Sequence, residues 1–147
     1  TAHAGEEGDS TYISRALDLC SIERIDHGIR LVDDEALLKR VAKDKTLVTM
    51  CPLSNVRLRC VTKVAELPIR KFLTEGVRFS INSDDPAYFG GYILDNYIAV
   101  QEAFRLNLKE WKFIADGAIE GSWCDGERKQ VLLEKVEQWA ESYKGTL

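Results

Sequence analysis

The chain has only two histidines, His3 and His27, and each lies at the end of a short apolar run, close to a glycine. A third run is followed instead by two adjacent acids, Asp84 and Asp85. Hydrolytic sites hold a divalent metal with imidazole and carboxylate ligands, and a further carboxylate can transfer protons. If the three runs are neighbouring strands, their ends predict a metal-dependent hydrolytic site.

The first motif spans residues 1–6 and has the sequence TAHAGE. Gly5 allows the backbone to turn without a Cβ clash, so Glu6 can face the same cavity as His3. The functional interpretation makes His3 a metal ligand and Glu6 a general acid. The structural alternative is a surface turn that leads into a helix, and the motif alone leaves both open.

Polar side chains also close two other strand-like runs. His27 immediately precedes Gly28. It could be a structural residue whose ring is hydrogen-bonded within the fold, or it could face the cavity. Because side chains alternate along an extended strand, we expect Asp26 to point the other way and to anchor a loop or helix outside the cavity. Ser54 and Asn55 are expected only to satisfy backbone groups, and we assign them no catalytic role.

The adjacent acids Asp84 and Asp85 are the most informative pair. Two neighbouring carboxylates repel unless a cation or hydrogen-bond donors compensate, so the pair indicates a metal site or a turn that caps a helix. Pro86 biases Asp85 away from helical backbone and fixes the exit of the chain. The aromatic and glycine-rich residues 88–92 could close over a flat heterocycle by stacking, or they could be ordinary packing.

Short strands alternate with amphipathic helices along the chain. We expect strands at residues 24–28, 46–51 and 77–82. The expected helices begin near Ser10, Asp33, Pro68, Ile93, Asn107 and Val131, and the last one ends at Gly145. Repetition of strand and helix indicates a parallel sheet, and motifs at the C-terminal ends of successive strands are typical of a β/α barrel.

A complete barrel needs about 250 residues, whereas this chain has 147. The expected fold class is therefore α/β, as the C-terminal half of a (β/α)8 TIM-type barrel with extra C-terminal helices. We expect residues 1–147 to form a single partial domain. The first residue is Thr1 rather than Met, and no strand precedes the first motif. We therefore expect the chain to be the back portion of a longer protein.

Composition limits the classes of partner. The net charge is −4 and the pI is about 5.3, without a basic stripe to follow a phosphate backbone, so we expect no nucleic-acid polymer as partner. No run approaches the roughly 20 apolar residues of a membrane span, so no membrane partner is expected. The cysteines form no Cys-x-x-Cys pair, which favours reduced thiols in a cytosolic setting. They are Cys20, Cys51, Cys60 and Cys124.

Together these motifs resemble the adenosine/adenine deaminase family of the metal-dependent amidohydrolase superfamily. The matching motifs are TAHAGE at 1–6, IDHG at 25–28, CPLSN at 51–55 and NSDDP at 82–86. Their order and spacing agree with the family from residue 1 to about residue 125. The run at residues 84–93 is most similar to the adenine deaminases, the fungal and bacterial ones included.

The resemblance implies a role for each matching residue. His3 and Asp84 would be ligands of one zinc ion per full-length chain. Glu6 would donate a proton to the purine ring nitrogen beside the reacting carbon, and His27 would orient the attacking water. Asp85 would hydrogen-bond the purine. The family completes its metal site with a His-x-His pair on its first strand, and this chain contains no such pair.

The implied activity is zinc-dependent hydrolytic deamination of adenine to hypoxanthine and ammonia, in purine salvage. The resemblance implies a small-molecule purine as partner and a location in the cytoplasm, with the nucleus as a second compartment. We expect the 147-residue chain alone to be inactive, because it carries only two of the expected metal ligands and lacks the His-x-His pair. An adenosine deaminase and a non-catalytic half-barrel that binds or scaffolds are the alternatives. The oligomeric state is left open.

Overall fold

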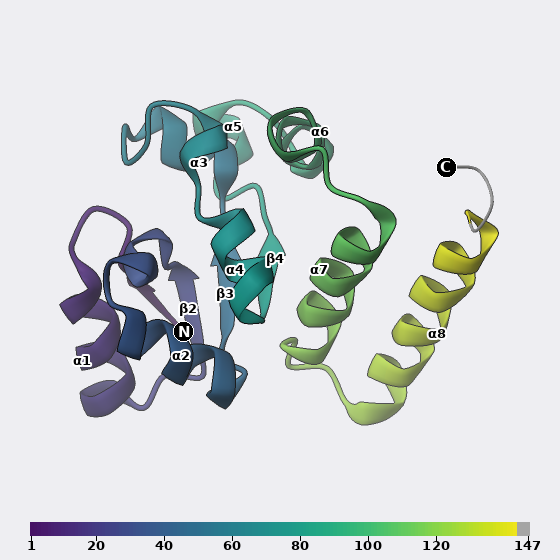
Figure 1. Ribbon diagram of the computed structural model, residues 1–147, viewed down its shortest axis with the longest axis horizontal. Coiled ribbons are helices and arrows are strands. Elements are labelled where there is room, and N and C mark those ends of the chain that lie inside the picture. The colour runs from purple at the N-terminus through teal and green to yellow at the C-terminus, as the bar shows by residue number, and fades with distance from the viewer. Residues whose placement is uncertain (144–147) are drawn as a thin grey trace.

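A computed structural model describes residues 1–143 of the chain and shows a four-stranded sheet with helices packed around it (Figure 1). The strands are all parallel and lie in the order in which they occur along the chain. They are β1 (Ala2–Ala4), β2 (Arg24–His27), β3 (Leu47–Met50) and β4 (Phe79–Ile81). The expected parallel sheet of an α/β fold is confirmed, and the chain's first motif adds a strand of its own.

Helical segments connect each strand to the next. They are α1 (Ser10–Cys20) after β1, η1 (Ile29–Asp33) and α2 (Glu35–Asp44) after β2, and α3 (Pro52–Arg57), η2 (Val64–Glu66) and α4 (Ile69–Glu75) after β3. Four more follow β4: α5 (Pro86–Phe89), α6 (Ile93–Phe104), α7 (Leu108–Glu120) and α8 (Gly126–Ser142). Gly145, the expected end of the last helix, lies outside the described residues. None of the helices in the described part combines the length and hydropathy that a membrane crossing requires.

Side-chain caps fix where several helices begin. The carboxylate of Asp9 accepts a hydrogen bond from the backbone amide of Thr11, so Asp9 caps α1 just before Ser10, where the helix was expected to begin. Asp34 caps α2 in the same way. Asn107 and Glu110 form a reciprocal capping box at the start of α7, the helix expected to begin near Asn107.

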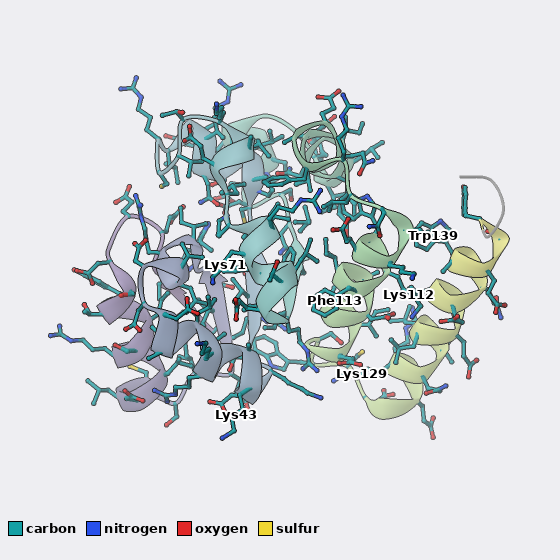
Figure 2. All side chains as sticks on the ribbon, in the orientation of Figure 1. Lys43, Lys71, Lys112, Phe113, Lys129 and Trp139 are labelled. Carbon is teal, nitrogen blue, oxygen red and sulfur yellow. The ribbon has the colours of Figure 1, made fainter. Side chains whose placement is uncertain are left out.

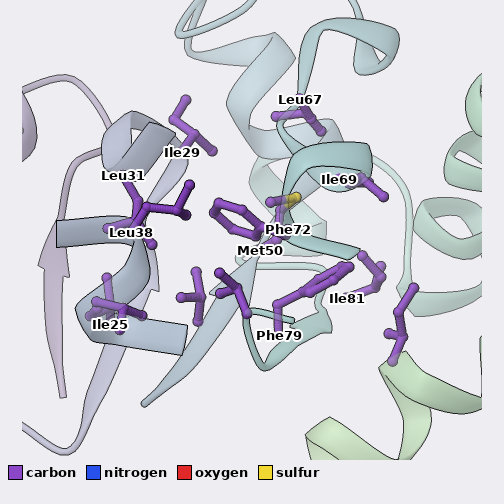
Figure 3. Packing of buried hydrophobic residues seen from close by; sticks show 14 of the residues in the cluster. Ile25, Ile29, Leu31, Leu38, Met50, Leu67, Ile69, Phe72, Phe79 and Ile81 are labelled. Carbon is purple, nitrogen blue, oxygen red and sulfur yellow. The ribbon is translucent and has the colours of Figure 1, made fainter. Parts of the chain in front are cut away.

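One face of the sheet packs against the connecting helices. Ile25, Val48 and Phe79 lie in register on β2, β3 and β4, and all three are fully buried. Leu38 from α2 and Phe72 from α4 belong to the same core, with the rings of Phe72 and Phe79 5.7 Å apart (Figure 3). Burying each such side chain contributes about 1.5–3 kcal/mol. This core fixes the strand ends that carry the site residues.

The opposite face of the sheet carries a polar row. His3, Asp26, Thr49 and Ser80 occupy paired positions on the four strands. When parallel strands follow one another in chain order, their crossover helices cover a single face. The polar row therefore lines the face that a barrel turns toward its axis.

The last helices extend the half-barrel beyond β4. Helix α7 packs on β4, and α8 lies outermost beside α7 (Figure 1). Lys112 reaches from α7 to α8, where its Nζ lies 3.1 Å from a carboxylate oxygen of Glu137 (Figure 2). Within residues 1–143, the outer edges of β1 and β4 pair with no further strand. The predicted half-barrel with extra C-terminal helices is confirmed.

Candidate functional site

The C-terminal ends of β1, β2 and β4 bring four of the predicted site residues together. His27 lies at the centre and is only 2% exposed. Its Nδ1 is 3.3 Å from Oε1 of Glu6, and its Nε2 is 3.9 Å from Oδ2 of Asp84. The ring centroids of His3 and His27 are 5.0 Å apart. The convergence that the sequence predicts for these four residues is therefore observed.

Gly5 positions Glu6 by allowing β1 to end directly against α1. Its φ is +68°, a backbone conformation that side chains disfavour. A Cβ at this position would lie 2.4 Å from the Cδ1 atom of Ile13, so a side chain would collide with α1. The turn directs the carboxylate of Glu6 toward His27, as the motif predicts.

His27 and Asp84 have left-handed backbone conformations, with φ of +68° and +56°. The same conformation at Ser21, Lys45 and Arg105 is explained because each ends a helix. No helix ends at His27 or Asp84. Such strain costs about 1–3 kcal/mol at each residue and is concentrated in functional sites. Here it turns an imidazole and a carboxylate toward each other.

Burial sets the proton affinity of the central groups. It raises the pKa of Glu6, and the neighbouring carboxylate of Asp84 raises it further. Burial also lowers the pKa of His27, although the carboxylate of Asp84 acts in the opposite direction. Glu6 therefore keeps a proton to higher pH than an exposed carboxyl group, and the imidazole of His27 favours its neutral form. A carboxyl group with a raised pKa thus lies beside an imidazole with a lowered pKa.

Two residues of the site were missed by sequence reasoning. The hydroxyl of Ser54 donates to Oδ2 of Asp84 at 2.6 Å, and the amide of Asn55 donates to Oε1 of Glu6 at 3.2 Å. The expectation that both only satisfy backbone groups is therefore wrong. Pro52 starts α3 directly after β3, so the helix's first turns face the strand ends. The sequence signal that could have indicated Ser54 and Asn55 was the CPLSN motif at residues 51–55, which follows β3 directly.

Asp26 is a third correction, because its carboxylate lies on the cavity side of the sheet. Its Oδ2 is 3.6 Å from Nδ1 of His3, since the two residues are paired on adjacent parallel strands and share a face. Burial acts to raise the pKa of Asp26, but hydrogen bonds from the hydroxyls of Thr1 and Thr49 outweigh it and lower the pKa. A carboxylate is thus held beside the imidazole of His3.

Asp85 stands apart from this cluster. Its side chain is exposed, and no hydrogen bond or ion pair joins its carboxylate to another group of residues 1–143. Its backbone oxygen accepts hydrogen bonds from the amides of Tyr88 and Phe89, at the start of α5. The side chain of Tyr88 is 81% exposed, whereas Phe89 is buried against it. A contact between Asp85 and a purine stays a prediction.

The donor groups at this site fit a divalent metal. Ligand atoms of His27, Cys51 and Asp84 all lie within 4.8 Å of one another, and imidazole, thiolate and carboxylate are all zinc ligands. Burial and the nearby carboxylates raise the pKa of Cys51 to about 12, so its thiol keeps its proton. Only the thiolate binds metal well. Without a metal ion, the carboxylate and imidazole groups are therefore the donors that need not lose a proton before they bind one.

Comparison with known proteins gives consistent relatives. The family model described as adenosine deaminase matches residues 1–139. The curated adenine deaminase of Schizosaccharomyces pombe is 60% identical over 143 residues, covering 97% of this chain and 39% of that protein. The adenine deaminase of Aspergillus fumigatus is 62% identical, covering 97% of this chain and 40% of that protein. The chain thus spans about two fifths of the length of these relatives.

Solved structures agree with the sequence relatives. An adenine deaminase from Arthrobacter aurescens superposes with a TM-score of 0.91 at 44% identity, covering 95% of this chain and 43% of that one. An amidohydrolase from Burkholderia ambifaria, solved with bound Zn, superposes with a TM-score of 0.87 at 27% identity. That match covers 99% of this chain and 41% of the other. The half-barrel therefore matches about two fifths of each of these two larger structures.

Proposed function

The chain belongs to the adenosine deaminase family, and from this premise we propose that it supplies much of the active site of a zinc-dependent adenine deaminase. The observation that carries the proposal is the cluster around His27, in which Glu6 lies at 3.3 Å and Asp84 at 3.9 Å. Curated relatives at about 60% identity bear the name adenine deaminase. This similarity favours adenine over adenosine as the substrate.

His3 and Asp84 are the residues we propose as zinc ligands. The side chain of His3 is 70% exposed, its Nδ1 lies 3.6 Å from Oδ2 of Asp26, and the carboxylate of Asp84 accepts a hydrogen bond from Ser54. The zinc reported in the Burkholderia ambifaria amidohydrolase supports zinc as the metal. When bound, zinc supplies the Lewis acidity that makes water nucleophilic near neutral pH.

Glu6 and His27 are the residues we propose for proton transfer and orientation. Glu6, whose pKa is raised by burial, would donate a proton to the purine ring nitrogen beside the carbon under attack. His27, neutral and buried, orients the attacking water, and Asp85 hydrogen-bonds the purine. Addition of water and loss of ammonia then convert adenine to hypoxanthine, a reaction of purine salvage. The free cysteines of the described chain suit a reducing compartment such as the cytoplasm.

Asp26 is expected to strengthen metal binding through His3. A carboxylate behind a ligating imidazole orients the ring and raises its basicity, and its loss lowers metal affinity by about 10- to 100-fold. We therefore expect Asp26→Asn to weaken zinc binding by about that factor, measured by competition with a zinc chelator. Asp33→Asn, which changes a carboxylate that follows β2 outside the cluster, is the control. Equal zinc affinity in both variants would remove Asp26 from this role.

The proposed function is tested in a chimera, in which this chain replaces the matching 39% of the Schizosaccharomyces pombe adenine deaminase. We expect the chimera to release ammonia from adenine much faster than from adenosine, and the 147-residue chain alone to release none. Faster turnover of adenosine would favour a nucleoside deaminase. A folded chimera with stoichiometric zinc but no activity on either compound would refute the proposal, and one without zinc would favour a scaffold.

A further inference from the structure

Asn55 is a buried amide whose nitrogen faces two residues of the proposed active site. It belongs to α3 and has 0% of its surface exposed. Its Nδ2 lies 3.2 Å from Oε1 of Glu6 and 3.3 Å from Nδ1 of His27. Those two atoms are themselves 3.3 Å apart. One amide nitrogen therefore contacts the proposed proton donor and the proposed water-orienting residue together.

The surroundings decide which way this amide faces. Oδ1 of Asn55 is buried and has no hydrogen-bond partner within the described chain. If the amide were turned over, its NH2 group would occupy that place and leave buried N–H groups unpaired. Buried N–H groups without partners are rarer than carbonyl oxygens without partners. The orientation with Nδ2 toward Glu6 and His27 is therefore the stable one.

This orientation fixes where two protons sit. The amide NH2 group has two N–H donors and no acceptor, so an atom that hydrogen-bonds to Nδ2 must accept, Nδ1 of His27 included. The neutral imidazole of His27 then carries its proton on Nε2, the nitrogen that faces Asp84. By the same argument, a proton on Glu6 sits on Oε2, because Oε1 accepts from Asn55.

We infer that Asn55 is a positioning residue that holds His27 in its Nε2–H tautomer and keeps the Oε2 proton of Glu6 for the purine. Its catalytic significance rests on the proposed function, whereas the placement of the protons rests on these contacts alone. Asn55 touches no reacting atom. It acts through Glu6 and His27, and its loss would leave Oε1 of Glu6 and Nδ1 of His27 without their shared amide donor.

The tautomer can be measured directly. The chain's only histidines are His3 and His27, so nitrogen-15 NMR of the imidazoles, assigned by the loss of one signal in His27→Asn, reports on His27. We expect a protonated Nε2 and an unprotonated Nδ1 at neutral pH, in the 147-residue chain and in the chimera. If the chain alone gives averaged signals, the chimera decides. A proton on Nδ1 there would overturn the inference.

Substitution in the chimera supplies the second test. Asn55→Asp replaces the donor with an acceptor, so we expect the proton of His27 to move to Nδ1. We expect Asn55→Asp and Asn55→Ala each to lower kcat by about 10- to 100-fold, because misplaced catalytic groups cost rates of this order. The KM for adenine should change less than about threefold, since binding and turnover separate in a positioning defect. Zinc content should be unchanged.

Asn96 provides the matched control. It is as deeply buried as Asn55, and its amide bonds the backbone of Leu53 and Tyr92 away from the cluster. We expect Asn96→Ala to lower Tm while leaving the tautomer and kcat unchanged. An unchanged tautomer in Asn55→Asp, or equal loss of kcat in the Asn55 and Asn96 variants, would overturn the inference. If the unsubstituted chimera fails on adenine, the proposed function fails, and the tautomer still decides the role of Asn55.

Discussion

Replacing Glu6 by glutamine in the chimera is expected to lower kcat for adenine by about 10²- to 10⁴-fold, the range that general acid catalysis contributes. The substitution preserves the shape of the side chain and removes the acidic proton. Burial and Asp84 raise the pKa of Glu6, which suits the carboxyl group to donate a proton, whereas glutamine has no acidic proton to transfer. Initial rates of ammonia release, with zinc measured in the same samples, check this result.

Glu7 offers a matched control, because it is the next residue along the chain and is exposed. Glu7→Gln should leave kcat unchanged, which separates loss of the proton donor from a general loss of negative charge. Zinc should stay at one ion per chain in both variants. Near-normal turnover in Glu6→Gln would remove Glu6 from the proposed role and would require another donor for the ring nitrogen.

Replacing Asp84 by asparagine is expected to abolish stoichiometric zinc binding. The metal contributes several kcal/mol of transition-state stabilisation, and about 4 kcal/mol corresponds to a factor of about 10³. We therefore expect kcat/KM for adenine to fall by at least about 10³-fold. Zinc analysis after dialysis, together with the rate of ammonia release, measures both consequences.

Cys51→Ala distinguishes the two ligand sets that the geometry allows. Asp84 belongs to both sets, whereas the thiol of Cys51 belongs only to the one that contains His27. Because the proposed ligands are His3 and Asp84, we expect Cys51→Ala to keep its zinc. Loss of zinc in Cys51→Ala with zinc retained in His3→Ala would assign the metal to His27, Cys51 and Asp84 instead.

The sequence predicted the strands and the cluster at their ends because those features depend on local patterns. Alternation of apolar and polar residues marked β4, and the short apolar run before His27 marked β2. Parallel strands in chain order then bring their C-terminal ends to one edge. The meeting of His3, Glu6, His27 and Asp84 follows from that topology.

The missed contacts depend on tertiary register and backbone strain. Asp26 faces His3 because β1 and β2 pair at these two positions, which alternation along one strand cannot indicate. Ser54 and Asn55 reach Asp84 and Glu6 because Pro52 starts a helix directly at the strand exit. Such contacts join residues 30 and 49 positions apart. They are set by the whole fold rather than by local composition.

The central claim is that this strand edge holds one zinc ion between His3 and Asp84. Anomalous diffraction at the zinc absorption edge, from crystals of the chimera, tests it most directly. We predict a single peak within about 2.0–2.2 Å of an imidazole nitrogen of His3 and a carboxylate oxygen of Asp84. A peak bonded to the sulfur of Cys51, or a zinc ion located away from these strand ends, would contradict the account.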